Sequence, residues 1–337
     1  MRVPIKPRFR RFAAGGLAVT IGATLAACSG TTGGGGAEAE FPSETVEIMV
    51  PAAAGGGWDS TARAMQQVME SEDIVTDSVE VFNVEGGGGA TGLAQLQGDQ
   101  GDPHKLMMTG LVMIGALEQA DSPVSLTDTT PLAILTSEAE AFVVPADSQF
   151  QTIEDVVEAH EADPASVTFG GGSAGGSDHL VVGELLQAAD GDPSQIKYVG
   201  YSGGGEAIAG ILSGDVAVGV SGVSEFEGQI ESGDMRLLAI STAETTDVAG
   251  EPAPTLQEAG YDVDFNNWRA IVAPPGLSEE QASSVVSTID ELHSSPGWDK
   301  ALEQNGWTDF YRTGDEAGQF VEEETTRVGE LFEELDL

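Results

Sequence analysis

The sequence is poor in cysteine, histidine and basic residues, and each shortage excludes a class of protein. Cys28 is the only cysteine among 337 residues, so no disulfide can form within the chain. The four histidines show neither H-E-x-x-H nor H-x-H spacing, so we expect no catalytic metal and no cofactor. Only 13 basic residues stand against 56 acidic residues, a balance that repels nucleic acid and anionic lipid headgroups. We interpret the acid excess as a solvated surface suited to high salt.

Long hydrophobic runs are also missing, except for the uncharged stretch from Phe12 to Ala27. Five of the 13 basic residues precede this stretch, which is too short to span a bilayer, so residues 1–28 are predicted to be a signal peptide. The stretch ends in Leu25-Ala26-Ala27-Cys28, a lipobox in which the Cys28 thiol takes the lipid. Residues 29–40 have the composition of a flexible tether. We therefore expect export and anchoring to the outer face of the cytoplasmic membrane, by either the Sec or the twin-arginine route.

The rest of the chain alternates short β-rich runs with helical periodicity, which is typical of parallel α/β units. The expected strands are Val46–Val50, Val79–Val84, Leu106–Met108, Val167–Phe169, Ile196–Val199, Val216–Val220 and Leu237–Ile240. The expected helices begin at Asp59 and Ala90 and cover Asp178–Ala188 and Gly204–Ser213. Strand-like runs near Ala141–Val144 and Phe265–Val272 have no polar linker, so the chain is expected to cross twice between two similar halves. A crossing pair of strands makes a hinge.

Glycine clusters fall where four expected strands end and helices begin. They are Gly55–Gly57, Gly86–Gly89, Gly170–Gly172 with Gly175-Gly176, and Gly203–Gly205. The first N–H groups of a helix have no intrahelical partner, and glycine lets a ligand approach them. Together with the positive end of the helix dipole, they form an anion site without a charged side chain. Because such loops meet at the carboxyl ends of the strands, we expect all four to face one cleft and to hold a carboxylated solute.

The stretches around these loops resemble the receptors of the tripartite tricarboxylate transporters, also called Bug receptors. The resemblance is carried by Phe41-Pro42-Ser43 through Val46–Pro51 to Gly55–Asp59, Val84–Gly92, Gly172-Ser173 through His179-Leu180 to Leu185, Tyr201–Ala207 through Gly214–Val216, Gly233–Ala239, Pro254–Leu256, and Trp268–Ala270 with Ala273–Gly276. It covers nearly all of the chain after the tether. No single motif is decisive, but their ordered combination is specific.

The resemblance implies a receptor, not an enzyme, with a two-lobed α/β fold like that of the type II periplasmic binding proteins. Each lobe is expected to be a mainly parallel sheet flanked by helices, with 41–141 plus 265–337 in lobe 1, 142–264 in lobe 2 and a hinged cleft between them. The receptor is expected to be a monomer that delivers a di- or tricarboxylate or an aromatic acid to a membrane permease. Carried over to this chain, the ligand-binding residues are Gly56, Gly57, Trp58, Asp59, Ser173, Ser177, Asp178, His179, Tyr201, Ser202 and Gly204.

Two positions depart from the family's pattern. Trp58 stands where a small or hydroxylated residue is usual, so its ring is expected to re-shape the pocket. Ser221 stands where a carboxylate is frequent, which argues weakly against an amino-acid ligand. For His179, a ligand contact and a structural position, as a cap or as a solvated imidazole, stay equal alternatives. Arg63 is expected to balance Asp59 one helical turn away.

The strand that contains Trp268 and Arg269 is expected either to bury the tryptophan in the core or to present both residues to the hinge side of the cleft.

A serine hydrolase is the main competing function, because Gly171-Gly172-Ser173-Ala174-Gly175 matches Gly-x-Ser-x-Gly between an expected strand and helix. Ser173 would then be the nucleophile and His293 its base, which leaves the other three glycine loops unexplained. A ligand sensor that contacts a histidine kinase instead of a permease stays open, as does the identity of the acid.

Overall fold

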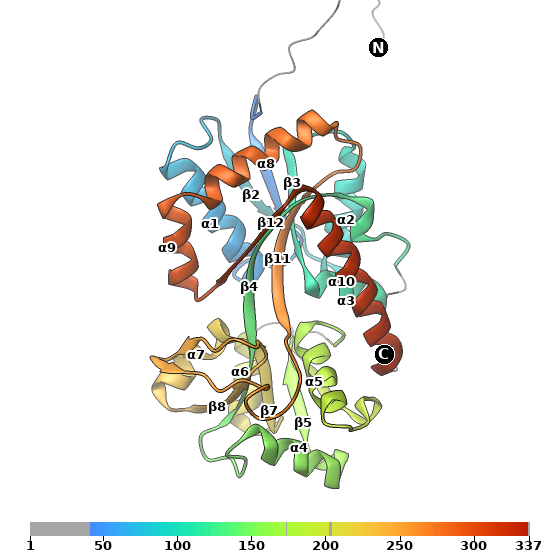
Figure 1. The fold of residues 1–337 in the computed structure, drawn as a ribbon, viewed down its shortest axis with the longest axis vertical. Helices are drawn as coiled ribbons and strands as arrows, with labels where there is room; N and C mark the ends of the chain where they lie inside the picture. The colour runs from blue at the N-terminus through green and yellow to red at the C-terminus, as the bar shows by residue number, and fades with distance from the viewer. Residues whose placement is uncertain (1–40, 121, 173, 202–203, 336–337) are drawn as a thin grey trace, which may run out of the picture. The chain divides into compact units, whose positions relative to one another are not determined.

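The computed structural model of the chain describes residues 41–120, 122–172, 174–201 and 204–335 (Figure 1). The predicted signal peptide, Cys28 and the tether lie outside these residues. The strands are β1 (Val46–Val50), β2 (Val79–Asn83), β3 (Lys105–Gly110), β4 (Thr130–Pro145), β5 (Thr168–Gly171), β6 (Lys197–Gly200), β7 (Val218–Gly222), β8 (Met235–Ile240), β9 (Asp247–Val248), β10 (Glu251–Pro252), β11 (Asn266–Ala273) and β12 (Thr308–Thr313). The α-helices are α1 (Gly57–Ser71), α2 (Ala90–Leu96), α3 (Leu111–Gln119), α4 (Ile153–Ala162), α5 (Ser177–Ala188), α6 (Gly204–Ser213), α7 (Val223–Ser232), α8 (Glu279–His293), α9 (Pro296–Asn305) and α10 (Gly314–Leu335).

The strands form a mixed sheet in the order β2-β1-β3-β11-β4-β7-β5-β6, with β8 and β12 also paired to β4. The α/β fold class is confirmed, and each strand and helix expected from the sequence is present. Most lie within a few residues of their expected bounds, but the strand expected near Ala141–Val144 begins at Thr130. The sheet is parallel within β1 to β3 and within β5 to β7, as expected. It is antiparallel wherever β4 or β11 pairs with a neighbour, so the sheet is not mainly parallel throughout. The reason is that β4 leads the chain out of the first half and β11 leads it back, so the two strands run in opposite directions.

Strand β4 belongs to both halves of the sheet. Its residues up to Ala139 pair with β11 and β12, and those from Glu140 onward pair with β7 and β8. The chain returns where the Phe265 N–H donates to the Ser241 carbonyl (2.9 Å), directly before β11 begins. Figure 1 shows β4 and β11 running side by side between the two halves. The two crossings are therefore confirmed, whereas the division into two lobes stays a prediction.

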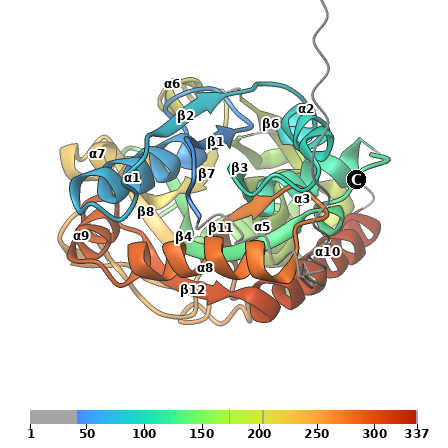
Figure 2. The ribbon, with the colours of Figure 1, turned by 90° about the horizontal axis from the view of Figure 1, so that it is seen from above.

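Both faces of the N-terminal strands are buried. In β1, Ile48 and Val50 pack in one hydrophobic cluster, and Met49 packs in another. This alternation follows from the two-residue period of a strand, and burial on both faces explains the nearly continuous apolar run in the sequence. Figure 2 shows α1, α8 and α9 gathered on one side of β1 and β3, with α2, α3 and α10 on the other.

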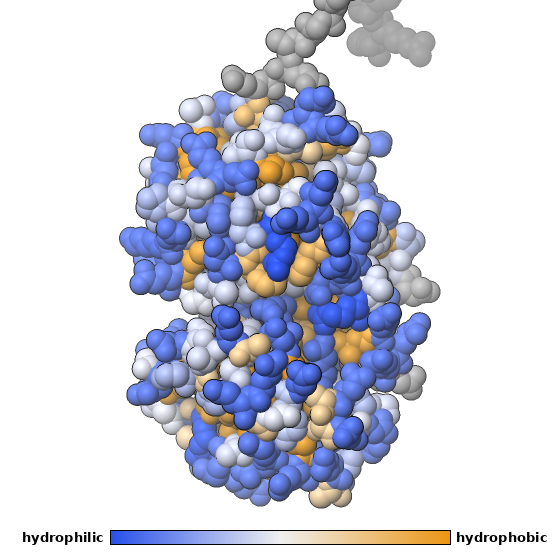
Figure 3. Space-filling view, in the orientation of Figure 1, coloured by the Kyte–Doolittle hydropathy of each residue, from blue (hydrophilic) through white to orange (hydrophobic). Residues whose placement is uncertain are grey.

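The surface is polar, as the composition predicts. Figure 3 shows a mostly hydrophilic face with small scattered apolar areas. Within the described ranges, the exposed large hydrophobic side chains are those of Val199 and Leu212. None of the helices in these ranges has the length and the apolar character that crossing a membrane requires.

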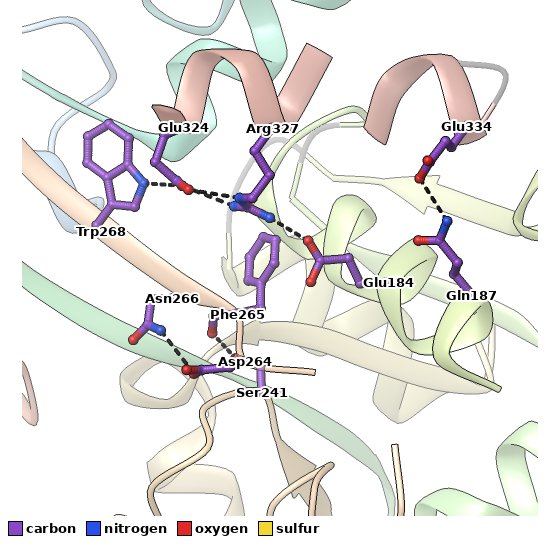
Figure 4. A network of polar contacts seen from close by, with 10 residues as sticks. All are labelled: Glu184, Gln187, Ser241, Asp264, Phe265, Asn266, Trp268, Glu324, Arg327 and Glu334. Atoms are coloured by element: carbon purple, nitrogen blue, oxygen red, sulfur yellow. Dashed lines mark hydrogen bonds and ion pairs between the residues drawn. The ribbon is translucent and has the colours of Figure 1, made fainter. Parts of the chain in front are cut away.

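A network of polar contacts ties the C-terminal helix α10 to both halves of the sheet (Figure 4). Trp268 Nε1 donates to Glu324 (2.7 Å), whose carboxylate also accepts two hydrogen bonds from Arg327 (2.8 and 3.0 Å). Arg327 in turn donates to Glu184 of α5, and its guanidinium lies over the ring of Phe265. Trp268 is fully buried, so of its two alternatives the core position is confirmed. One arginine thus holds α10, β11 and α5 together.

Replacing Arg327 by Met removes both ion pairs and leaves two carboxylates close to each other. The side chains of Glu184 and Glu324 are only 20% and 14% exposed, whereas that of Arg327 is 37% exposed. We expect the free energy of unfolding to fall by about 1–3 kcal/mol, less than for a fully buried pair. Urea unfolding followed by circular dichroism measures this loss. Glu322→Gln, on the exposed side of the same helix, is the control, and a loss for Arg327→Met as small as the control's would contradict the prediction.

Candidate functional site

A cavity of about 640 Å³ lies where the loops of the sheet meet. It is lined by Pro51–Ala53 and Gly56–Trp58 after β1, Glu85–Gly88 after β2, Gly172 and Gly176–Asp178 after β5, Tyr201 after β6, and Ser221-Gly222 at the end of β7. Further lining residues include Val112, Glu138, Ala207, Glu225, Asn267 and Arg269. All four glycine loops picked out in the sequence thus have residues at one cavity, although they lie up to about 150 positions apart along the chain.

The predicted ligand-binding residues fall into three groups. Those that line the cavity are Gly56, Gly57, Trp58, Ser177, Asp178 and Tyr201. Asp59 and His179 do not line it. Gly204 is the first residue of α6. Ser173 and Ser202 lie outside the described residues. That the lining residues hold a ligand stays a prediction.

Asp59 faces its own loop and not the cavity. It is buried, and its carboxylate accepts hydrogen bonds from Gly55 N–H (2.9 Å), Arg63 Nε (2.9 Å) and Asn83 Nδ2 (3.0 Å). Burial by itself raises the pKa of Asp59, but the hydrogen bonds from Arg63, Gly55 and Asn83 outweigh burial and lower that pKa below its ordinary value. The expected pairing of Arg63 with Asp59 is confirmed. Asp59 therefore fixes the loop while no side chain caps the N-terminus of α1 at Gly56.

The ring of Trp58 lies against two glycines from neighbouring elements. A Cβ atom added at Gly110 would stand 3.0 Å from Trp58 Nε1, and one at Gly89 would stand 3.5 Å from Trp58 Cζ3. The indole thus occupies space that these glycines leave open, and it forms part of the cavity wall. The structure shows how the chain accommodates the large ring that the sequence places at this position.

Asp178 lies in the first turn of α5, and its carboxylate faces the loop before the helix. Asp178 is buried, and it accepts hydrogen bonds from Gly172 N–H (2.6 Å) and Ser177 Oγ (2.9 Å). Burial raises the pKa of Asp178 above its ordinary value, although these hydrogen bonds oppose the rise. An acidic side chain thus lies beside the glycine loop where the sequence predicts an anion site, while no side chain caps α5 at Gly176. The anion site itself stays a prediction.

His179 has a structural position behind the cavity wall. Its Nδ1 accepts a hydrogen bond from Gly175 N–H (3.1 Å), and its ring stacks on Tyr198 with the ring centroids 4.3 Å apart. Burial lowers the pKa of His179 from 6.5 to about 4, so the imidazole is neutral at physiological pH. His179 thus has a structural contact with the loop before α5, while its contact with a ligand stays a prediction.

A buried ion pair that the sequence analysis missed lies between the crossing strands. Arg269 Nη2 on β11 donates to Glu138 Oε2 on β4, and Glu138 Oε1 also accepts from Ser224 N–H (2.8 Å) at the start of α7. The guanidinium packs against Gly57, where an added Cβ would stand 2.6 Å from Nη2. Arg269 Nη1 is buried and has no hydrogen-bond partner among the described residues. Arg269 is thus a cation at the cavity with one donor group unused.

Glu140 lies one strand period beyond Glu138 and is completely buried. Neither of its carboxyl oxygens has a hydrogen-bond partner in the described ranges. Burial raises the pKa of Glu140 well above its usual range, and the nearby Asp178 raises that pKa further. The spacing of the two acids in Ser137-Glu138-Ala139-Glu140 could have revealed them, because residues two apart in a strand lie on the same face of the sheet.

One group of side chains away from the cavity has the composition of a metal site. Ligand atoms of Glu44, Asp102 and His104 all lie within 4.8 Å of one another. His104 Nε2 accepts a hydrogen bond from Ser43 N–H (3.1 Å), so this nitrogen is already used. The ring also packs against Phe41 with the centroids 5.1 Å apart. His104 thus holds residues 41–43 on the folded body through Nε2, while its Nδ1 faces Asp102 (3.4 Å) and Glu44 (3.6 Å).

The competing hydrolase reading finds no support at His293. This histidine is at the end of α8, where it contacts Asp309 (3.0 Å) and stacks on Tyr311 with the ring centroids 3.7 Å apart. It does not line the cavity. Its proposed partner, Ser173, lies outside the described residues.

The fold is that of the solute-binding proteins of bacterial uptake systems. MatC from Rhodopseudomonas palustris, solved with bound malate, superimposes with a TM-score of 0.72, 21% sequence identity and coverage of 86% of this chain and 99% of MatC. Rpa4515 from R. palustris, solved with adipate, gives a TM-score of 0.72 at 20% identity and covers 88% and 98% of the two chains. At these identities the likeness shows the fold alone.

Sequence comparison then shows the family. Residues 62–337 match the description "Tripartite tricarboxylate transporter family receptor", and the chain belongs to this family. A relative from Agrobacterium vitis, the UPF0065 protein in the TAR-I ttuE-ttuC' intergenic region, is 30% identical over 258 residues, which are 75% of this chain and 73% of the relative. The chain is thus an extracytoplasmic solute-binding receptor from a family of receptors and not of enzymes.

Protonation of His179 should destabilise the fold. The unfolded chain binds this proton near pH 6.5 and the folded chain only near pH 4, so stability is lost as the pH falls between these values. His179→Gln keeps an acceptor for Gly175 N–H and does not titrate. Between pH 8 and pH 5, we expect the wild type to lose about 2 kcal/mol more free energy of unfolding than His179→Gln loses. Urea unfolding at both pH values measures this shift, and a difference that does not change with pH would refute the prediction.

Proposed function

We propose that this receptor captures a small carboxylate in the cavity and delivers it to the permease of a tripartite tricarboxylate transporter. The uncapped N-terminus of α1, next to the unused Nη1 of Arg269, is the observation that carries the proposal. Main-chain N–H groups at a helix start and a guanidinium are the groups that bind carboxylates best in proteins. The malate in MatC and the adipate in Rpa4515 support a ligand of the same class.

Closure of the cavity is the second part of the proposal. Residues 41–141 plus 265–337 form one lobe and residues 142–264 the other, and the lobes rotate about β4 and β11. The cavity walls come from both segments, for example Gly57 from the first and Asp178 from the second. A ligand that contacts both walls stabilises the closed state by its differential affinity for that state. The closed receptor is then the form that the permease recognises.

The membrane attachment completes the proposal. Cys28 carries the lipid, and residues 29–40 act as the tether between the lipid and the folded body. Support comes from the lipobox sequence and from the placement of the family outside the cytoplasm. More than one acyl chain makes the anchoring stable, and the receptor works as a monomer.

A ligand screen by thermal shift tests the carboxylate proposal. The full-length chain is heated with mono-, di- and tricarboxylates, amino acids and sugars, each at millimolar concentration. A ligand with a micromolar dissociation constant adds about 4 kcal/mol of stability, which corresponds to a rise in Tm of about 6 °C for a chain of this size. We expect compounds with a carboxylate to raise Tm. A screen in which only sugars or other compounds without a carboxylate raise Tm would contradict the proposal.

The double variant Arg269→Gln, Glu138→Gln locates the carboxylate site. It removes the guanidinium without leaving a buried carboxylate unpaired, so the fold is expected to survive. We expect affinity for the best carboxylate to fall by about 10- to 100-fold, as titration calorimetry would measure. Arg312→Gln is the matched control, because this arginine stacks on Phe310 and Phe320 and does not line the cavity. Equal affinities of the double variant and the control would place the carboxylate elsewhere.

A further inference from the structure

The longer helices that begin at the cavity share an acidic residue in the first turn. It is Asp59 in α1, Asp178 in α5, Glu206 in α6 and Glu225 in α7. A carboxylate in the first turn interacts favourably with the positive end of the helix dipole. The same carboxylate repels an anion that approaches from outside, unless a base neutralises it.

At α1 the acid is neutralised and faces away from the cavity. Arg63 Nε donates to Asp59 (2.9 Å), and Asp59 does not line the cavity. A second arginine lies against the start of this helix, because Arg269 packs on Gly57. Its side chain is only 7% exposed, and its Nη1 has no hydrogen-bond partner among the described residues. An oxygen of a bound solute would satisfy this buried donor, which is costly to leave unpaired.

Elsewhere the cavity wall is acidic. Asp178 and Glu225 line the cavity, and so does Glu85 in the loop after β2. Arg269 is the one lining base in the described ranges. Its positive charge is already shared, because Nη2 is bound to Glu138 and the guanidinium also acts on Glu225. A second carboxylate on the solute would therefore meet acids on each wall and find no further base.

We propose that the cavity holds a single carboxylate, at the start of α1 beside Arg269, so that the solute is a monocarboxylate with no second negative charge. The inference rests on the proposed function and names its substrate class. A second carboxylate would lie near Glu85, Asp178 or Glu225, and like charges repel most strongly where water is excluded. MatC and Rpa4515 were solved with malate and adipate, which are dicarboxylates. The inference thus separates this chain from both relatives.

Dicarboxylates and their amides test the inference by titration calorimetry on the full-length chain at pH 8. Each series keeps one skeleton: succinate, succinamate and succinamide; adipate, adipamate and adipamide; phthalate, phthalamate and phthalamide. Replacing a carboxylate by an amide removes one negative charge and changes the shape little. We expect the half-amide of at least one series to bind at least about tenfold more tightly than its dicarboxylate.

The double variant Glu85→Gln, Glu225→Gln tests the origin of this preference. Both side chains are exposed and line the cavity, so the fold is expected to survive their exchange. We expect the ratio of half-amide affinity to dicarboxylate affinity to fall to about threefold or less. Glu80→Gln, Glu227→Gln is the matched control, because it removes the same charge from exposed residues that do not line the cavity. An equal fall in the control would assign the preference to net charge and overturn the inference.

The outcomes separate the inference from the function on which it rests. If the dicarboxylate binds as tightly as the half-amide in every series and the diamide does not bind, the single-carboxylate inference is wrong and the carboxylate proposal stands. If the diamide binds as tightly as the half-amide, the carboxylate proposal itself is wrong. Absence of binding in all three series contradicts both.

Discussion

The site depends on the buried ion pair between Glu138 and Arg269. The two residues are on β4 and β11, the strands that carry the chain between the halves of the sheet. Taking two charges out of water costs several kcal/mol for each ion, and the pair is tolerated because Glu138 has a second donor in Ser224 N–H. Through this donor the pair fixes the start of α7, and through its contact with Gly57 it fixes the start of α1. Two helix starts thus take their positions from one contact at the crossing strands.

Acidic side chains give this site a character that its glycine loops alone would not have. Helix starts of this kind are commonly used to bind anions from outside the protein. Here Glu138 accepts the Ser224 N–H at the start of α7, and Asp178 accepts the Gly172 N–H in the loop before α5, so two of the N–H groups near the cavity are already used. The fully buried Glu140 lies beneath, and burial favours its neutral form. The distribution of charge in the cavity is therefore set as much by which acids are buried as by how many there are.

The sequence predicted the features that depend on local pattern. Strand and helix periods gave the fold, and the glycine clusters gave the loops that meet at the cavity. It did not predict which way a polar side chain faces: Asp59 faces its own loop and His179 caps a neighbouring glycine. Nor did it predict the pairing of Glu138 with Arg269, since these residues are 131 positions apart and meet only through the register of β4 with β11. Such a register depends on how the whole sheet assembles, and no short motif encodes it.

The contacts of Gly89 and Gly110 decide which positions of this cavity can vary in evolution. A Cβ atom at Gly110 would clash with the Trp268 carbonyl oxygen, and one at Gly89 would stand 2.5 Å from Met113 Cε, so both glycines are constrained by more than the indole of Trp58. Exchange of the tryptophan for serine would therefore free neither glycine to vary, and no later side chain there would block the return of the ring. A change of solute size in this lineage through position 58 would thus be easy to reverse.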